Sequence, residues 1–463
     1  MAAETGTPGR ADPLLHPYTN ESKLAVSGPM TVTEGHGIYV RDDKGRTLIE
    51  GLAGLWCTAL GFGNERLADA ASRAMRRLSF YHGFGGKSHP AMEDLAARLL
   101  AIAPASPDGP MAKVFFANSG SEANDSAIKL VWYANNALGR PRKKKIIGRR
   151  RGYHGVTIAS ASLTGIPNNH RSFDLPLPGF LHTDCPHHYR EAQPGESEDA
   201  FATRLAQSLD DLILREGPET VAAFFAEPVM GAGGVIVPPQ TYFAKIQAVL
   251  RRHDVLLIAD EVICGFGRTG QRFGCETFGI VPDMVTVAKA LSSAYLPISA
   301  LLISPRLADA ILAQSAEIGV LAHGFTYSGH PVAAAVALEA LRIYDEIDIV
   351  SHVQRVAPRL QNGLRSFANN PLVGEVRGVG LIAGLELVQD RASKASFPAA
   401  AGVGAYLQAR AQDHGLITRA IGGDVVALAP PLVITEAEID LVLDRLGRAL
   451  DDTTTWARAQ RLI

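Results

Sequence analysis

Short, unbroken runs of apolar residues alternate with helical segments through the middle of the chain, and this alternation restricts the fold more than any other feature. The apolar runs span 114–117, 145–147, 221–226, 255–259, 284–288 and 299–303. Segments with helical periodicity between them span 92–102, 121–137, 201–214 and 242–252. Unbroken apolar runs are typical of strands buried on both faces, and strands that alternate with helices build a mainly parallel sheet. We therefore predict an α/β fold in which helices cover such a sheet.

The pattern changes after Pro331, where helices dominate. Helical segments then span 332–344, 350–367, 403–414 and 436–450, with strand-like pieces at 380–387 and 424–428. Near the N-terminus, a turn at 42–45 between 37–40 and 46–49 predicts a β-hairpin, and the proline-containing stretch before it predicts irregular chain (Pro8, Pro13, Pro17, Pro29). We expect a large domain at 76–330 and a smaller α+β domain at 331–463, which the N-terminal segment 1–75 joins.

Composition excludes several classes of protein. The 45 basic and 47 acidic side chains give a net charge of −2, which argues against nucleic-acid or anionic-membrane binding. No apolar stretch reaches the roughly 18 residues of a membrane span, and residues 1–20 lack the apolar core of a signal peptide. The four cysteines are too few and too scattered for a disulfide framework. A cytoplasmic location is the expectation that follows.

Three polar groups follow predicted strands. Asn118-Ser119-Gly120-Ser121-Glu122 lies between a strand and a helix, and its hydroxyls, glycine and free helix N–H groups form a phosphate cradle. Ser119 and Glu122 also fit a helix capping box. Asp260 ends one apolar run, where an acid can face a cationic ring nitrogen. Lys289 ends another among apolar residues, and burial of an amine favours its use as a nucleophile.

Taken together, these groups match the needs of pyridoxal 5′-phosphate (PLP). This cofactor requires an amine for its aldehyde, a site for its phosphate and an acid on its pyridinium nitrogen. Tyr153, within Gly152-Tyr153-His154-Gly155, supplies an aromatic ring that can stack on the cofactor.

Further motifs extend the match along nearly the whole chain. They are Gly54-Leu55-Trp56, Asn118 to Asn124, Tyr153-His154-Gly155, Ala226 to Gly234, Ala259 to Gly270, His323 to Pro331, and Ala429-Pro430-Pro431-Leu432. With these motifs in this order, the chain resembles the class III (omega) aminotransferases of PLP fold-type I, and most of all the amine–pyruvate aminotransferases. The resemblance implies a seven-stranded sheet in the large domain and a homodimer with active sites at the subunit interface.

The resemblance also assigns roles to residues. Lys289 would bind the cofactor covalently and move the proton, and Asp260 would hold the ring nitrogen. The other cofactor-binding positions would be Gly120, Ser121, Tyr153, His154, Glu227, Val262 and, from the neighbouring subunit, Thr326. Substrate would contact Trp56, Phe84 and Tyr153, while Arg419 would be a mobile arginine that pairs with a substrate carboxylate. Arg150 stands where some relatives carry an aromatic residue, and the sequence leaves its direction open.

The implied reaction moves an amino group from a primary amine or omega-amino acid to a 2-oxo acid, with pyruvate as the expected acceptor, by a ping-pong mechanism. The alternatives within PLP chemistry are an aminomutase and a decarboxylating aminotransferase, because the same lysine serves all three. A nicotinamide oxidoreductase is a more remote alternative. It rests on the Gly-x-Gly-x-x-Gly pattern at 265–270, which no helical pattern follows.

Three other patterns have simpler interpretations. Gly85-Gly86-Lys87-Ser88 resembles a P-loop but has Tyr81 where the first glycine belongs. The histidines at 182–188 lack a second paired cluster, so we predict a surface loop and no metal. The basic run 140–151 contains the apolar pair Ile146-Ile147, which favours a strand within a solvated or dimer-facing stretch.

Overall fold

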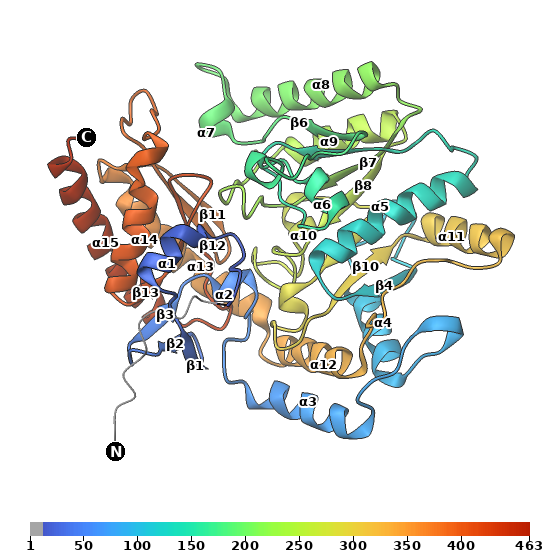
Figure 1. The fold of residues 1–463 in the computed structure, drawn as a ribbon. Coiled ribbons are helices and arrows are strands. Elements are labelled where there is room, and N and C mark those ends of the chain that lie inside the picture. The colour runs from blue at the N-terminus through green and yellow to red at the C-terminus, as the bar shows by residue number, and fades with distance from the viewer. Residues whose placement is uncertain (1–12) are drawn as a thin grey trace.

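The structure, a computed structural model, describes residues 13–463. Pro8 and most of residues 1–20, where the sequence predicts no signal peptide, lie outside the described residues. A seven-stranded sheet forms the centre of the larger part (Figure 1). Its strands, in spatial order, are β4 (Lys113–Ala117), β10 (Ser299–Ile303), β9 (Met284–Val287), β8 (Leu256–Asp260), β7 (Val221–Ala226), β5 (Lys145–Arg149) and β6 (Phe180–Thr183). Strand β10 pairs antiparallel with both β4 and β9, and all other neighbouring strands of this sheet pair in parallel. The predicted mainly parallel α/β sheet is therefore confirmed.

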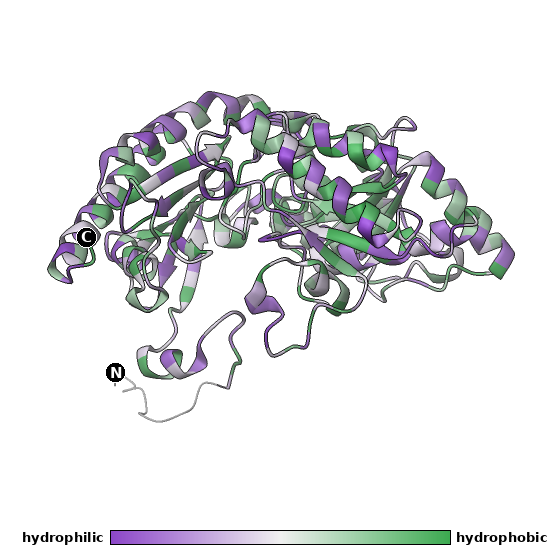
Figure 2. Ribbon diagram, turned by 90° about the horizontal axis from the view of Figure 1, so that it is seen from above, coloured by the Kyte–Doolittle hydropathy of each residue, from purple (hydrophilic) through white to green (hydrophobic). Residues whose placement is uncertain are grey.

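Helices bury both faces of this sheet, which explains why its strands are apolar without interruption. Leu256 and Ile258 of β8 pack in one cluster with residues of α5 (Gly120–Ala137) and α11 (Pro305–Ile318). The alternate residues Leu257 and Ala259 belong to the opposite cluster, which includes α8 (Glu198–Glu216) and α9 (Tyr242–Arg252). Figure 2 shows largely hydrophobic strands inside the larger part and, around them, helices in which hydrophilic and hydrophobic residues alternate. Such two-sided burial supplies the main driving force for this fold.

Two smaller sheets accompany the large one, and the first of them joins the two ends of the chain. One contains β1 (Val32–His36), β2 (Tyr39–Asp42), β3 (Thr47–Glu50) and β13 (Leu416–Ile417), and β13 pairs with β3 in parallel. The other contains β11 (Val373–Val379), β12 (Ile382–Leu387), β15 (Val425–Leu428) and β14 (Arg419–Ile421). In Figure 1 the blue N-terminal strands accordingly lie beside the orange and red C-terminal elements. The predicted hairpin is present, whereas the domain boundaries at residues 75 and 330 stay a prediction.

The remaining helices complete the framework. They are α1 (Glu21–Ser27), α2 (Ala53–Trp56), α3 (Glu65–Arg77), α4 (Pro90–Ile102), α6 (Ile158–Leu163), α7 (His188–Glu191), α10 (Gly274–Phe278), α12 (Pro331–Glu346), α13 (Ile349–Arg365), α14 (Val403–Asp413) and α15 (Glu436–Ala459). Helix α1 corrects the prediction of irregular chain before residue 30. It has no buried residue and begins because the Asn20 side chain caps the N–H of Lys23. None of the helices within residues 13–463 has the length and apolarity needed to cross a bilayer.

Candidate active site

A pocket lies at the carboxyl ends of the central strands, where ligands bind in open α/β sheets. Its lining consists of Gly120, Ser121, Asn124, Tyr153, His154, Gly155, Glu227, Asp260, Val262, Ile263 and Lys289. Of the nine predicted cofactor-binding residues, the structure brings eight together here, and Thr326 alone is absent from the lining. The side chains come from four different strand ends and from the start of α5, so only the folded sheet assembles them.

Asp260 is the last residue of β8 and is 3% exposed, and both oxygens of its carboxylate accept hydrogen bonds. Its Oδ2 accepts hydrogen bonds from Asn124 Nδ2 at 2.9 Å and His154 Nδ1 at 2.8 Å, while Oδ1 accepts from the Val262 N–H at 3.2 Å. These three donors fix the orientation of the Asp260 carboxylate on the pocket wall.

Lys289 lies just after β9, in a backbone conformation that is costly for a lysine. Its φ is +48°, in the left-handed region, where a residue with a side chain is strained by about 1–3 kcal/mol. Fully buried strand residues precede Lys289, and Ala290 and Leu291 after it are also buried, so the surroundings hold this conformation. Such strain concentrates at functional positions, and here it directs the lysine to the pocket that contains Asp260.

The opposite end of the pocket is built to receive an anion. Helix α5 starts at Gly120, and Ser119 caps it by accepting the Glu122 N–H at 3.2 Å. Only this half of the predicted capping box forms, because the Glu122 carboxylate instead accepts the Asn118 N–H at 2.7 Å. Gly155, with φ +138°, packs so closely that a Cβ would lie 2.5 Å from the hydroxyl oxygens of Ser121 and Ser160. A helix N-terminus, a serine hydroxyl and a glycine that allows close approach suit a phosphate group.

Glu227 follows β7 and fixes the loop that carries Tyr153. Its carboxylate accepts the backbone N–H groups of Tyr153 and Gly231, each at 3.0 Å. Burial raises the pKa of Glu227, and the nearby Asp260 raises it further, whereas His154 and Arg149 lower it. Arg149, fully buried at the end of β5, donates to the Glu227 carbonyl at 2.6 Å. Glu227 thus fixes the backbone at Tyr153, which lines the pocket, and at Gly231.

Of the predicted substrate-binding residues, Tyr153 lines the pocket, whereas Trp56, Phe84 and Arg419 are not part of its lining. Trp56 is 4% exposed in α2, and the charge of Lys289 acts on the thiol of its neighbour Cys57. Phe84 is 50% exposed, and its ring lies close to Gly324. Thr326, in the segment that follows, is also exposed. Phe84 and Thr326 therefore lie on an exposed face of this chain.

Arg419, the arginine expected to be mobile, begins strand β14, where its backbone pairs with Ala427 of β15. The tip of this hairpin follows at Gly422-Gly423, where both residues have positive φ. The guanidinium of Arg419 forms no hydrogen bond or ion pair with any residue from 13 to 463. Burial raises the pKa of Tyr153 and the neighbouring Tyr18 raises it further, whereas the positive charge of Arg419 opposes this rise. An uncompensated cation therefore acts near the aromatic wall of the pocket.

Arg150, whose direction the sequence left open, points away from the pocket. Its guanidinium pairs with Asp184 at 3.1 Å, and its side chain is 68% exposed. The Gly265–Gly270 segment forms turns without a helix at the glycines, which excludes a Rossmann phosphate site there. Gly85 and Gly86 form an exposed 3-10 turn.

Two predictions about exposure were wrong. His187, expected on a surface loop, is 2% exposed because strands β11 and β12 cover it. Lys143 and Arg149, expected in a solvated basic run, are 6% and 0% exposed. Lys143 donates to the carbonyls of His253 and Asp254, and burial lowers its pKa to about 8. The covering residues in each case are distant in sequence.

Sequence reasoning missed two residues of the site. Asn124 lies one helical turn after Gly120, on the same face of α5, and this spacing was the available signal. Tyr18 reaches the Tyr153 hydroxyl from the N-terminal segment and accepts a hydrogen bond from Asn169 Nδ2 at 2.5 Å. No periodicity surrounds Tyr18, so only the tertiary structure places it.

Known proteins similar to this chain identify its family. The family model "Aminotransferase class-III" matches residues 21–450. A chloroplastic gamma-aminobutyrate transaminase 3 of Solanum lycopersicum is 52% identical over 95% of this chain and 84% of its own length. An omega transaminase of Pseudomonas jessenii, solved in complex with PMP, is 57% identical with a TM-score of 0.94, covering 96% of this chain and 97% of that one. A structure described as a transaminase with L-ala is 55% identical with a TM-score of 0.90, covering 92% and 99%.

Proposed function

We propose, from the premise that this chain belongs to the class-III aminotransferases, that it moves an amino group from a primary amine or omega-amino acid to pyruvate by a ping-pong mechanism. It is an aminotransferase of the PLP-dependent kind, and its pocket has the features that PLP requires: a lysine, a fixed acid and an anion cradle. One observation gives the best support for pyruvate as the acceptor. The unpaired cation of Arg419 lies near Tyr153, where it can receive a carboxylate.

The names of relatives point in the same direction. Gamma-aminobutyrate, the donor named for the plant relatives, is an omega-amino acid. The transaminase of known structure that holds L-alanine holds the compound that amination of pyruvate produces. A single pocket for both half-reactions would have to accept an amine in one step and a 2-oxo acid in the next.

The residues of this chain divide the chemical work. PLP, when bound, supplies an aldehyde that takes up the amino group and a ring that accepts the electron pair of a deprotonated carbon. Lys289 Nζ acts as the base that removes the proton from the amine-bearing carbon of the donor. Asp260 keeps a proton on the ring nitrogen by placing a fixed negative charge beside it. Ser121 and the first N–H groups of α5 would hold the phosphate, and Tyr153, whose backbone N–H the Glu227 carboxylate accepts, would supply an aromatic face for the ring.

Arg419 gives the pocket its two specificities. A buried arginine fixed inside the pocket would bind a 2-oxo acid well but would leave an uncompensated charge beside an apolar amine, at a cost of several kcal/mol. A guanidinium that starts outside the lining avoids this cost, because it turns inward only when a carboxylate is present. The absence of a partner for Arg419 among residues 13–463 leaves its side chain free to do so.

We also propose that the active enzyme is a homodimer. Phe84 and Thr326 lie on an open face that would become part of a site only if a second chain covered it. In this arrangement, Thr326 of the partner subunit would reach the phosphate cradle.

Substrate assays of the purified holoenzyme test the proposal. A panel of arylalkyl amines and omega-amino acids is offered with pyruvate or 2-oxoglutarate, and L-alanine, L-glutamate and released carbon dioxide are measured. We expect alanine without carbon dioxide, and parallel double-reciprocal plots when both substrates are varied. Carbon dioxide release, isomerisation of the donor without an acceptor, or glutamate as the sole product would refute the proposed reaction.

A further inference from the structure

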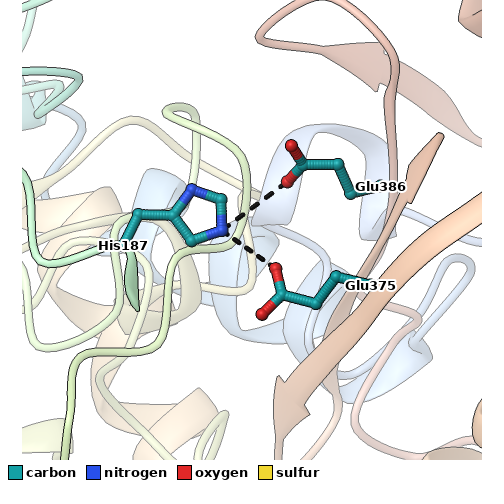
Figure 3. A group of neighbouring side chains, drawn as sticks. All are labelled: His187, Glu375 and Glu386. Carbon is teal, nitrogen blue, oxygen red and sulfur yellow. Dashed lines mark hydrogen bonds and ion pairs between the residues drawn. The ribbon is translucent and has the colours of Figure 1, made fainter. Parts of the chain in front are cut away.

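A buried group of charges connects the large sheet with the sheet that carries Arg419. His187 Nε2 lies 2.9 Å from Glu375 Oε2 and 3.6 Å from Glu386 Oε2, as Figure 3 shows. These three side chains could hold a metal by distance alone. However, Arg377 Nη1 bonds to both carboxylates, and Arg190 also pairs with Glu386, so guanidinium groups already neutralise the two acids. The cluster is therefore an ion-pair network rather than a metal site.

The protonation of His187 follows from its partners. An ionised Glu375 can only accept, so His187 Nε2 carries the hydrogen. Burial lowers the pKa of His187, which keeps the ring neutral and leaves Nδ1 as an acceptor. Arg151 Nη1 lies 3.2 Å from this Nδ1 and donates to it. The network thus holds the side chain of Arg151 in place.

Arg151 is also unusual in its backbone. Its φ is +67°, a left-handed conformation that strains a residue with a side chain. Its N–H donates to the Gly165 carbonyl at 2.8 Å, and Tyr153 follows only two residues later. A strained conformation persists only where surrounding contacts determine it, so the Arg151 side chain has a position that the fold enforces.

Three glycines from two distant segments surround Arg151. A Cβ at Gly233 would lie 2.2 Å from the Arg151 carbonyl oxygen, and a Cβ at Gly234 or at Gly422 would lie 3.0 Å from Arg151 Nη2. Gly422 forms the tip of the hairpin of β14 and β15, three residues after Arg419. A side chain at Gly234 or Gly422 would compete with the guanidinium for space, and one at Gly233 would clash with the Arg151 backbone. Because these three residues are glycines, Arg151 has the space to lie against the hairpin tip.

We propose that Arg151 is a positioning residue, which fixes the tip of the β14–β15 hairpin and so sets the reach of Arg419 toward the acceptor carboxylate. The inference rests on the proposed function, since it concerns the same Arg419. The Arg151 guanidinium lies beside the hairpin tip, since a Cβ at Gly422 would be 3.0 Å from its Nη2, and it also donates to His187 through Nη1.

Arg151→Met tests the inference, because methionine keeps an unbranched stem and removes the charge and the N–H donors of the guanidinium. Arg150→Met is the matched control: it removes the same charge one residue earlier, where the side chain points to solvent and pairs with Asp184. We expect the pyruvate concentration for half-maximal rate to rise about tenfold in Arg151→Met, with the amine half-reaction changed less than about twofold. The dissociation constant of oxamate, a non-reacting analogue of pyruvate, measured by calorimetry on the holoenzyme, should rise in parallel.

Gly422→Ala disturbs the same contact from the hairpin side, since its Cβ would meet Arg151 Nη2. We expect the same selective weakening of pyruvate and oxamate binding. In the Arg419→Ala background neither substitution should weaken oxamate binding further, because their effect passes through Arg419. Equal losses in both half-reactions, additive losses with Arg419→Ala, or a similar loss in Arg150→Met would overturn the inference. A wild-type enzyme that does not aminate pyruvate would instead refute the proposed function, so the two failures are distinguishable.

Discussion

Asp260→Asn removes one charge from the pocket and changes almost nothing else in its shape. His154 and Asn124 both donate to Oδ2, and an asparagine oxygen turned toward them keeps these two bonds. Its amide nitrogen would then face the Val262 N–H, a contact between two donors that costs about 1–3 kcal/mol. We therefore expect a folded but somewhat less stable protein.

The effect on catalysis should be far larger. A unit charge within hydrogen-bond reach, at about 3 Å and an effective dielectric constant near 20, contributes roughly 5 kcal/mol. This energy corresponds to about four units in the pKa of the ring nitrogen. Because deprotonation of the donor carbon depends on that proton, we expect the amine half-reaction to slow by about 10³-fold or more.

Stopped-flow absorbance of the bound cofactor measures this half-reaction directly. Glu261→Gln serves as the control, since it alters the adjacent buried carboxylate, which accepts the N–H groups of Gly274 and Cys275 instead. This control should unfold at a different temperature but react within a few-fold of the wild-type rate. A half-reaction of Asp260→Asn within tenfold of wild type, with cofactor still bound, would show that the charge of Asp260 is not what sustains the reaction.

Three further predictions concern other positions. Lys289→Ala should abolish multiple turnovers, since the anchoring amine and the base are lost together, and sustained alanine formation by the purified variant would exclude this role. Arg419→Ala should weaken pyruvate binding at least about tenfold while an uncharged arylalkyl amine reacts normally, and equal losses in both half-reactions would contradict it. Burial raises the pKa of Glu50 to about 7 from 4.5, so this carboxyl favours folding below about pH 4.5 and loses that contribution as the pH rises through 7. Between pH 5 and 8, the free energy of unfolding of Glu50→Gln should therefore rise relative to that of wild type by up to about 3 kcal/mol. Thermal unfolding midpoints that differ by a constant amount across this range would refute the assignment.

Local patterns in the sequence were sufficient to predict the elements that build the large sheet. Six of its seven strands lie within or next to predicted apolar runs, because a strand buried on both faces has to be apolar at every position. The missed strand β6, Phe180–Thr183, has two half-buried residues, one of them His182, and so lacks that pattern. Helix α3 was missed for a similar reason, since only Leu67 and Ala70 are buried in it.

The chemistry of the site was also readable in the sequence, since each group follows a strand or starts a helix. Asp260, Lys289 and the Gly120-Ser121 cradle could be assigned to one cofactor because parallel strands end at the same edge of a sheet. What the sequence alone could not provide is the set of contacts between segments that are far apart in the chain. The direction of Arg150, the burial of His187 and the approach of Tyr18 to Tyr153 all depend on such contacts. A residue's neighbours along the chain determine its secondary structure through periodicity and capping, whereas burial, pairing and direction depend on whichever distant segment packs against it, and only the tertiary structure decides that.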